Sequence, residues 1–170
     1  CKIAAVVAVI LSGCSKSQSE SDPTSVPSAK ADNSNVSAVS FIDNNTVWKD
    51  TNTQNIQAQG GNILKDGTLY HWFGMEYPLW KAVNHYTSTD LKNWTKQVAA
   101  LTPGMSGLPF GATDWVGRPY VMKNPNAGMS PYVMTIEWAL GSPTVRNRYC
   151  FLTATSLNGP WTFQASKTIN

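Results

Sequence analysis

The sequence is poor in charged residues and contains only two histidines and three cysteines. Charged side chains make up 14% of the 170 residues, whereas a typical soluble domain has about 25%. The net charge of +3 is not gathered into a basic stripe, which excludes a nucleic-acid-binding surface. His71 and His85 have no metal-site spacing with Cys1, Cys14 or Cys150, and three cysteines cannot build a disulfide framework.

Long hydrophobic runs are also missing. The longest, at residues 3–11, is much shorter than the roughly 20 residues of a membrane-spanning helix, and it fits the apolar core of a secretory signal. The Leu-Ser-Gly-Cys sequence that ends at Cys14 resembles a bacterial lipobox, which implies cleavage before this cysteine and a lipid on its thiol. The alternative is a buried strand that ends in a free cysteine.

We therefore expect a lipoprotein signal peptide at 1–13, and a lipidated Cys14 with a flexible Ser-rich tether at 14–46. The folded part would then begin at about residue 47. This organisation predicts a protein of the bacterial cell envelope, outside the cytoplasm, which contacts the membrane through its lipid anchor only.

Tryptophan is absent from the first 47 residues and frequent after them. The seven tryptophans stand at positions 48, 72, 80, 94, 115, 138 and 161. When position 80 is set aside, successive tryptophans are 21 to 24 residues apart. A spacing this regular indicates a repeated supersecondary unit, in which most of the tryptophans would belong to the core.

The folded part reads as strands and turns, without a helical pattern. Asp66-Gly67 between two apolar runs predicts a β-hairpin. Two seven-residue turns that end in Trp, at 88–94 and 155–161, are separated by 67 residues, and Tyr70 and Tyr132 in the preceding hairpins are separated by 62. A unit of this length with about four strands is typical of a β-propeller blade.

Several segments resemble family 43 glycoside hydrolases, and especially the branch that includes the exo-β-1,3-galactanases. The segments that carry the resemblance are 48–51, 56–61, 66–74, 86–94, 118–121 and 159–163. The resemblance covers about residues 48–165. It implies an all-β fold, a five-bladed β-propeller of which residues 47–170 supply about the first two blades.

The resemblance also implies hydrolysis of a glycosidic bond with inversion, by two carboxyl groups about 6.5–9.5 Å apart. In the wider family the base is an aspartate on the first blade, which falls on Gln59 here. The amide oxygen of Gln59 can orient a water molecule, although it cannot take a proton as a carboxylate does. An acidic residue of the galactanase branch falls on Met75, with Glu76 adjacent.

The other expected carboxylates are substituted or lie beyond the sequence. The second-blade glutamate of the branch falls on Gly117, so this carboxylate is absent unless Asp114 in the same loop supplies it. The general acid of the third blade is expected after Asn170. Asp50, in a loop that the family folds over the cleft, is the other weak catalytic candidate, with a purely structural role as the alternative.

The candidate substrate-binding residues are Gln59, Glu76, Arg118, Glu137 and Trp138. A carboxylate beside an aromatic ring suits a sugar, whose apolar face stacks while its hydroxyls bond to the acid; an exposed strand end is the alternative for this pair. For Arg118, the alternative is an ion pair with Asp114 that supports the loop.

These observations lead to two hypotheses of function and a plain alternative. The first is an anchored glycoside hydrolase that acts on plant or algal polysaccharides, with a galactan as one candidate substrate. The second is a non-catalytic, carbohydrate-binding propeller lipoprotein, and the third is a propeller used for protein contact alone.

His71 is expected on the strand surface. The sequence specifies no cofactor or metal, although calcium occurs in such propellers.

Overall fold

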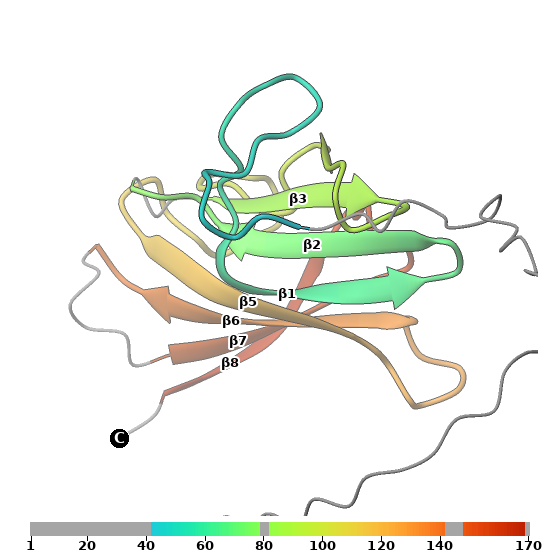
Figure 1. The fold of residues 1–170 in the computed structure, drawn as a ribbon. Coiled ribbons are helices and arrows are strands. Elements are labelled where there is room, and N and C mark those ends of the chain that lie inside the picture. The colour runs from blue at the N-terminus through green and yellow to red at the C-terminus, as the bar shows by residue number, and fades with distance from the viewer. Residues whose placement is uncertain (1–41, 79–81, 142–147, 169–170) are drawn as a thin grey trace, which may run out of the picture. The chain divides into compact units, whose positions relative to one another are not determined.

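The computed structural model describes residues 42–78, 82–141 and 148–168, which form two four-stranded antiparallel sheets (Figure 1). The first sheet contains β1 (Gln59–Asp66), β2 (Leu69–Met75), β3 (Val83–Ser88) and β4 (Thr95–Lys96). The second contains β5 (Trp115–Lys123), β6 (Tyr132–Ala139), β7 (Arg148–Ala154) and β8 (Thr162–Thr168). Each sheet is a meander, because its strands pair in chain order. This part of the chain holds no helix, so the all-β prediction is confirmed.

The tightest hairpin lies where the sequence predicts it. Asp66 pairs with Leu69 across the turn, and Gly67 has a φ of +58°. A side chain disfavours this left-handed conformation, whereas glycine adopts it at little cost. The Asp-Gly pair therefore sets the register of β1 against β2.

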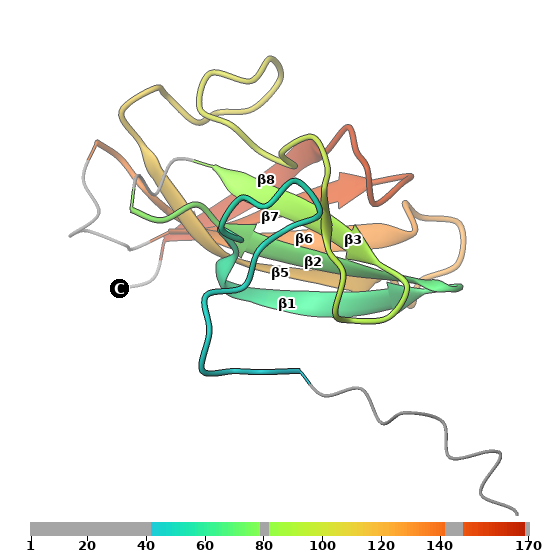
Figure 2. The same ribbon diagram turned by 45° about the horizontal axis from the view of Figure 1, so that its top comes forward.

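The core lies between the two sheets, where β5 crosses against β1 and β2 (Figures 1 and 2). Phe73 and Val83 from the first sheet meet Met134, Ile136 and Leu152 from the second, and all five are fully buried. These residues alternate with side chains on the opposite face of each strand, as the period of two in a β-strand requires. The two sheets thus share one hydrophobic core.

Hydrogen bonds also join the two innermost strands. The side-chain amide of Asn62 in β1 donates to the carbonyl of Val121 in β5 at 2.8 Å, and its oxygen accepts from the amide of Val121 at 2.8 Å. One asparagine therefore satisfies both backbone groups of a residue on the other sheet, and fixes the strands in register.

The two sheets repeat each other in detail, since β1 and β5 carry a β-bulge at the same place. Gln59 is the last residue of β1 before the bulge and pairs with Met75. Gly117 is the corresponding residue of β5 and pairs with Glu137. Gln59 and Gly117 are thus equivalent positions, as are Met75 and Glu137. The predicted four-stranded repeat is confirmed.

The tryptophan spacing reflects this repeat only in part. Trp94 and Trp161 follow β3 and β7, and both are buried, so they are equivalent as predicted. Trp72, however, lies three residues before Met75 in β2. Its counterpart three residues before Glu137 is therefore Met134 and not Trp138.

The outer face of the second sheet is apolar and exposed. Among the side chains on it are those of Tyr120, Met122, Tyr149 and Phe151, which are 36–53% exposed. They alternate along β5 and β7 with the buried residues of the shared core.

The predicted signal peptide at 1–13, the lipid site at Cys14 and most of the tether lie outside the described residues. None of the elements in the described segments is a helix long and apolar enough to cross a membrane.

Candidate functional site

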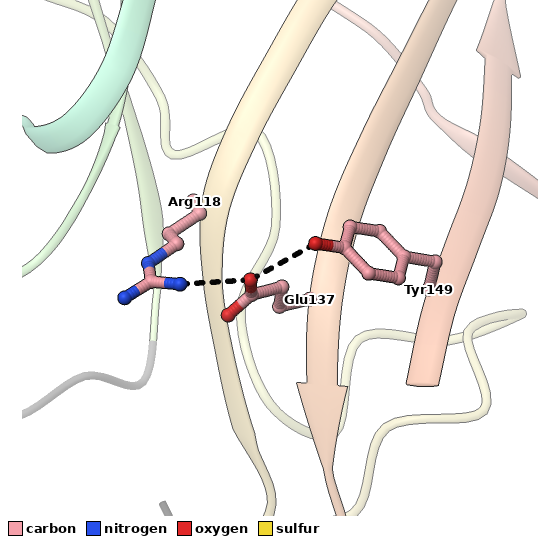
Figure 3. Close-up of polar contacts among 3 residues, drawn as sticks. All are labelled: Arg118, Glu137 and Tyr149. Atoms are coloured by element: carbon pink, nitrogen blue, oxygen red, sulfur yellow. Dashed lines mark hydrogen bonds and ion pairs between the residues drawn. The ribbon is translucent and has the colours of Figure 1, made fainter. Parts of the chain in front are cut away.

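Arg118, Glu137 and Tyr149 form a cluster of polar side chains on three adjacent strands (Figure 3). Glu137 pairs in register with Gly117 of β5 on one side and with Tyr149 of β7 on the other. The Nη1 of Arg118 donates to Oε1 of Glu137 at 2.9 Å, and the hydroxyl of Tyr149 donates to the same oxygen at 3.1 Å. The bond to the Glu137 carboxylate raises the pKa of Tyr149.

The second carboxylate oxygen of Glu137 has no such partner. Oε2 is buried and makes no hydrogen bond to any described residue, and Figure 3 draws no dashed line to it. Glu137 as a whole is only 7% exposed. An unpaired buried acceptor is unfavourable, more so when charged, and each such atom in a native structure calls for an explanation, of which a functional role is one.

The backbone of Arg118 adopts a rare conformation. Its φ is +47°, while the equivalent position in the first sheet is Gly60, with a φ of +61°. Glycine suits this place in a bulge, whereas an arginine is strained there by on the order of 1–3 kcal/mol. The side chain of Arg118 is 56% exposed and pairs with Glu137, so the expected ion pair with Asp114 is wrong.

Gly117 leaves no room for a side chain. A Cβ atom at this position would lie 2.6 Å from the ring of Trp115 and 2.7 Å from the sulfur of Met75. Met75 and Trp115 pack together with Ala139 in a small buried cluster. The two expected acidic positions, Met75 and Gly117, therefore belong to one apolar plug, and Glu137 lies opposite Gly117 on the neighbouring strand.

Gln59 lies at the edge of a pocket. It is exposed at the start of β1 and lines a depression of about 410 Å³ together with Trp48, Trp72 and Tyr77. The amide of Gln59 thus stands beside three aromatic rings, an arrangement that suits the apolar face and the hydroxyls of a sugar.

Glu76 and Asp50 line a second, more polar pocket of about 450 Å³ that also contains Lys96. Glu76 is half-buried, whereas Asp50 is 6% exposed. The Oδ1 of Asp50 accepts from the backbone amides of Asn52 and Gln54, at 2.9 and 3.0 Å. Asp50 therefore stabilises its own turn, and Glu76 is the carboxylate of this pocket that remains available to a ligand.

Asp114 and Trp138 have structural roles. The carboxylate of Asp114 accepts from the backbone amides of Gly111 and Gly141 and from the indole Nε1 of Trp138 at 3.0 Å. Burial raises the pKa of Asp114, but these hydrogen bonds outweigh it and leave the pKa below its usual value. Trp138 is 6% exposed and packs against Phe110, so its ring is not open to a sugar as the predicted aromatic platform would require, and the alternative of an exposed strand end is also wrong for it.

The two histidines form a buried pair that the sequence does not reveal. The Nδ1 of His71 lies 3.0 Å from the Nε2 of His85, and the rings stack. The expectation that His71 lies on the strand surface is wrong, because it is 7% exposed. The two residues come from adjacent strands, and only the register of β2 against β3 brings them together. In the described segments, no group of three or more His, Cys, Asp or Glu residues could hold a metal ion.

The chain is similar in structure and sequence to several galactan-degrading enzymes. An exo-β-1,3-galactanase from Phanerochaete chrysosporium, solved with galactose, shares 35% identity over 72% of this chain and 29% of its own, with a TM-score of 0.62. The fold is a partial β-propeller of the GH43 type. An exo-β-1,3-galactanase from Clostridium thermocellum shares 30% identity over 74% of this chain and 27% of its own, with a TM-score of 0.63.

A GH43 β-1,3-galactosidase solved with galactodeoxynojirimycin shares 33% identity over 71% of this chain and 36% of its own, with a TM-score of 0.63. The chain thus spans about a third or less of the length of these proteins, and its two sheets correspond to two blades. No family model and no curated protein matches the chain.

Proposed function

We propose that this protein is a GH43 glycoside hydrolase that cleaves β-1,3-linked galactans of plant or algal origin, with inversion. The observation that carries the proposal is the 30–35% identity to solved exo-β-1,3-galactanases over more than 70% of this chain. The polar residues near the bulges of β1 and β5, with Gln59, Arg118 and Glu137 among them, support a carbohydrate site.

Within this proposal the described residues bind and orient the sugar. Gln59 and the aromatic rings beside it receive one part of the ligand, and Glu76 lines the neighbouring pocket. Gln59 would orient the attacking water through its amide oxygen.

Incubation of the intact protein with β-1,3-galactotriose tests the hydrolase. We expect release of galactose, and NMR of the first product should show the α-anomer, because inversion reverses the configuration of a β-linkage. A panel of aryl glycosides and other galacto-oligosaccharides extends the search. If no sugar is released from any of them, the hydrolase proposal is refuted.

A non-catalytic, carbohydrate-binding protein is the second candidate, and one observation favours it. The apolar plug of Met75 and Trp115 fills the place where the branch carries acidic residues. Measurable affinity for β-1,3-galactotriose without any product would identify this second function.

We also propose that the protein is attached to the bacterial cell envelope through a lipid on Cys14. The support is the lipobox-like sequence that ends at this cysteine. Labelling with a radioactive fatty acid should mark the wild-type protein and not the Cys14→Ser variant. Equal labelling of both would refute the anchor.

A further inference from the structure

We propose that Glu137 binds a hydroxyl group of the carbohydrate through Oε2, and that Arg118 and Tyr149 are positioning residues that hold Oε1. The inference rests on the proposed carbohydrate function of this site and names the atom that makes the contact. Neither the sequence pattern nor the similarity to galactanases assigns a role to Tyr149.

A second cluster of the same composition shows why the arrangement at Glu137 is unusual. Tyr132, Asp66 and Lys123 also combine a tyrosine, a carboxylate and a cation. There the hydroxyl of Tyr132 donates to Oδ2 of Asp66 at 2.6 Å, and Nζ of Lys123 lies 2.7 Å from Oδ1. Each oxygen of Asp66 thus has its own donor, and the cluster is complete.

At Glu137 the two donors converge on one oxygen. Arg118 and Tyr149 both bond to Oε1, so Oε2 is left without a donor although it is buried. In a cluster built only for stability, the donors would be divided between the oxygens, as they are at Asp66. The free oxygen therefore indicates a donor that arrives with a ligand.

One other buried polar atom in the described segments has no partner, the indole Nε1 of Trp161. That group is neutral, and its ring packs edge-on against Phe73 inside the shared core. The carboxylate of Glu137 differs in two respects, because it is charged when ionised and because it adjoins the exposed side chain of Arg118. Leaving a charged group unpaired costs more than leaving a neutral one.

The chemistry of the site selects the class of ligand. A group that satisfies Oε2 must donate a hydrogen bond, as a sugar hydroxyl does. The carboxylate of a uronic acid or a sulfate ester can only accept, and the positive charge of Arg118 is already paired with Glu137. The site therefore suits a neutral sugar. Because Oε2 has no exposed surface, the side chains around it must shift when the ligand binds, and the neighbouring Arg118 side chain is exposed enough to take part.

Binding of β-1,3-galactotriose to the intact protein, measured by calorimetry, tests this inference. In Glu137→Gln the amide has nearly the shape of the carboxylate, but its nitrogen cannot accept a hydrogen bond. We expect the affinity to fall about 10- to 100-fold, the range for a bond to a charged group. Tyr149→Phe should weaken binding about 2- to 10-fold, because the carboxylate loses one positioning bond.

The Asp66 cluster supplies matched controls. Asp66→Asn and Tyr132→Phe remove the same chemical groups from a complete cluster at the other end of β1 and β6. They should lower thermal stability and leave the affinity unchanged. If they weaken binding as much as the variants at Glu137 and Tyr149, the effect is one of stability, and the inference is overturned.

Four deoxygalactoses, each lacking the hydroxyl at position 2, 3, 4 or 6, provide a second test. The pattern of affinities for these sugars would not change if Glu137 had only a structural role. The wild-type protein should lose affinity for one deoxy sugar in particular, and Glu137→Gln should show no further loss for that sugar. If folded Glu137→Gln binds like wild type, or loses affinity equally for all four sugars, the inference alone fails. If the wild-type protein neither binds nor cleaves any galactoside, the proposed function fails as well.

Discussion

The buried histidine pair should make the fold sensitive to acid. His85 is 1% exposed, its ring centroid lies 4.4 Å from that of Phe73, and its Nε2 lies 3.0 Å from Nδ1 of His71. Burial, and secondarily the charge that His71 can carry, lowers the pKa of His85 to about 3. In the unfolded chain a histidine has a pKa of about 6.5. The unfolded state therefore binds the proton more readily, and stability falls as the pH drops from about 6.5 toward 3.

The size of the effect follows from the two pKa values. Each pH unit between them corresponds to about 1.4 kcal/mol, so His85 should reduce the free energy of unfolding by about 2 kcal/mol between pH 7 and pH 5. His71 acts in the same direction, because burial lowers its pKa more than the nearby Asp66 raises it.

Urea denaturation of the intact protein and of His85→Gln, each at pH 7 and pH 5, measures the difference. The glutamine amide can still bond to His71 but does not titrate, and His71 is present in both proteins. We expect wild type to lose about 2 kcal/mol more than the variant on acidification. If both proteins lose the same free energy, His85 is not held neutral by its burial, and the reasoning is refuted.

Three further predictions concern packing. Gly117→Ala should reduce the free energy of unfolding by about 1–3 kcal/mol, because the added Cβ meets the Met75 sulfur. In a Met75→Ala background the same substitution should cost less, and additive losses of the two substitutions in urea denaturation would contradict this. Trp138→Phe should reduce the free energy of unfolding by about 2 kcal/mol, because it removes a hydrogen-bond donor to Asp114, and should leave galactotriose binding unchanged. Weakened binding in calorimetry would instead support a role of Trp138 in stacking on the sugar. Residues 41–170 expressed alone should aggregate, because the second sheet exposes several large apolar side chains on its outer face. A soluble monomer with a cooperative thermal transition would contradict this.

Local signals in the sequence predicted much of the fold. The Asp-Gly turn before Leu69 and the repeated turns that end at Trp94 and Trp161 depend on neighbouring residues, so they can be read from the chain. The all-β class and the four-stranded repeat followed from them.

The site was predicted in composition but not in arrangement. Arg118 and Glu137 were both candidates, yet their pairing, and the exclusion of Asp114 from it, depends on the register of β5 against β6. Tyr149 gave no signal, because nothing near it in the sequence distinguishes it from the other tyrosines of the strands. The burial of Trp138 was missed because a strand position does not reveal which face meets the other sheet.

By itself, the sequence determined the strands, the turns and the repeated unit, because these depend on residues that are close together along the chain. Only the tertiary structure decided which polar groups meet. It brought both donors to one oxygen of Glu137, filled the space at Gly117 with Met75 and Trp115, and joined His71 to His85. The physical reason is that each of these contacts joins different strands, so that a shift of one residue in register would separate the groups.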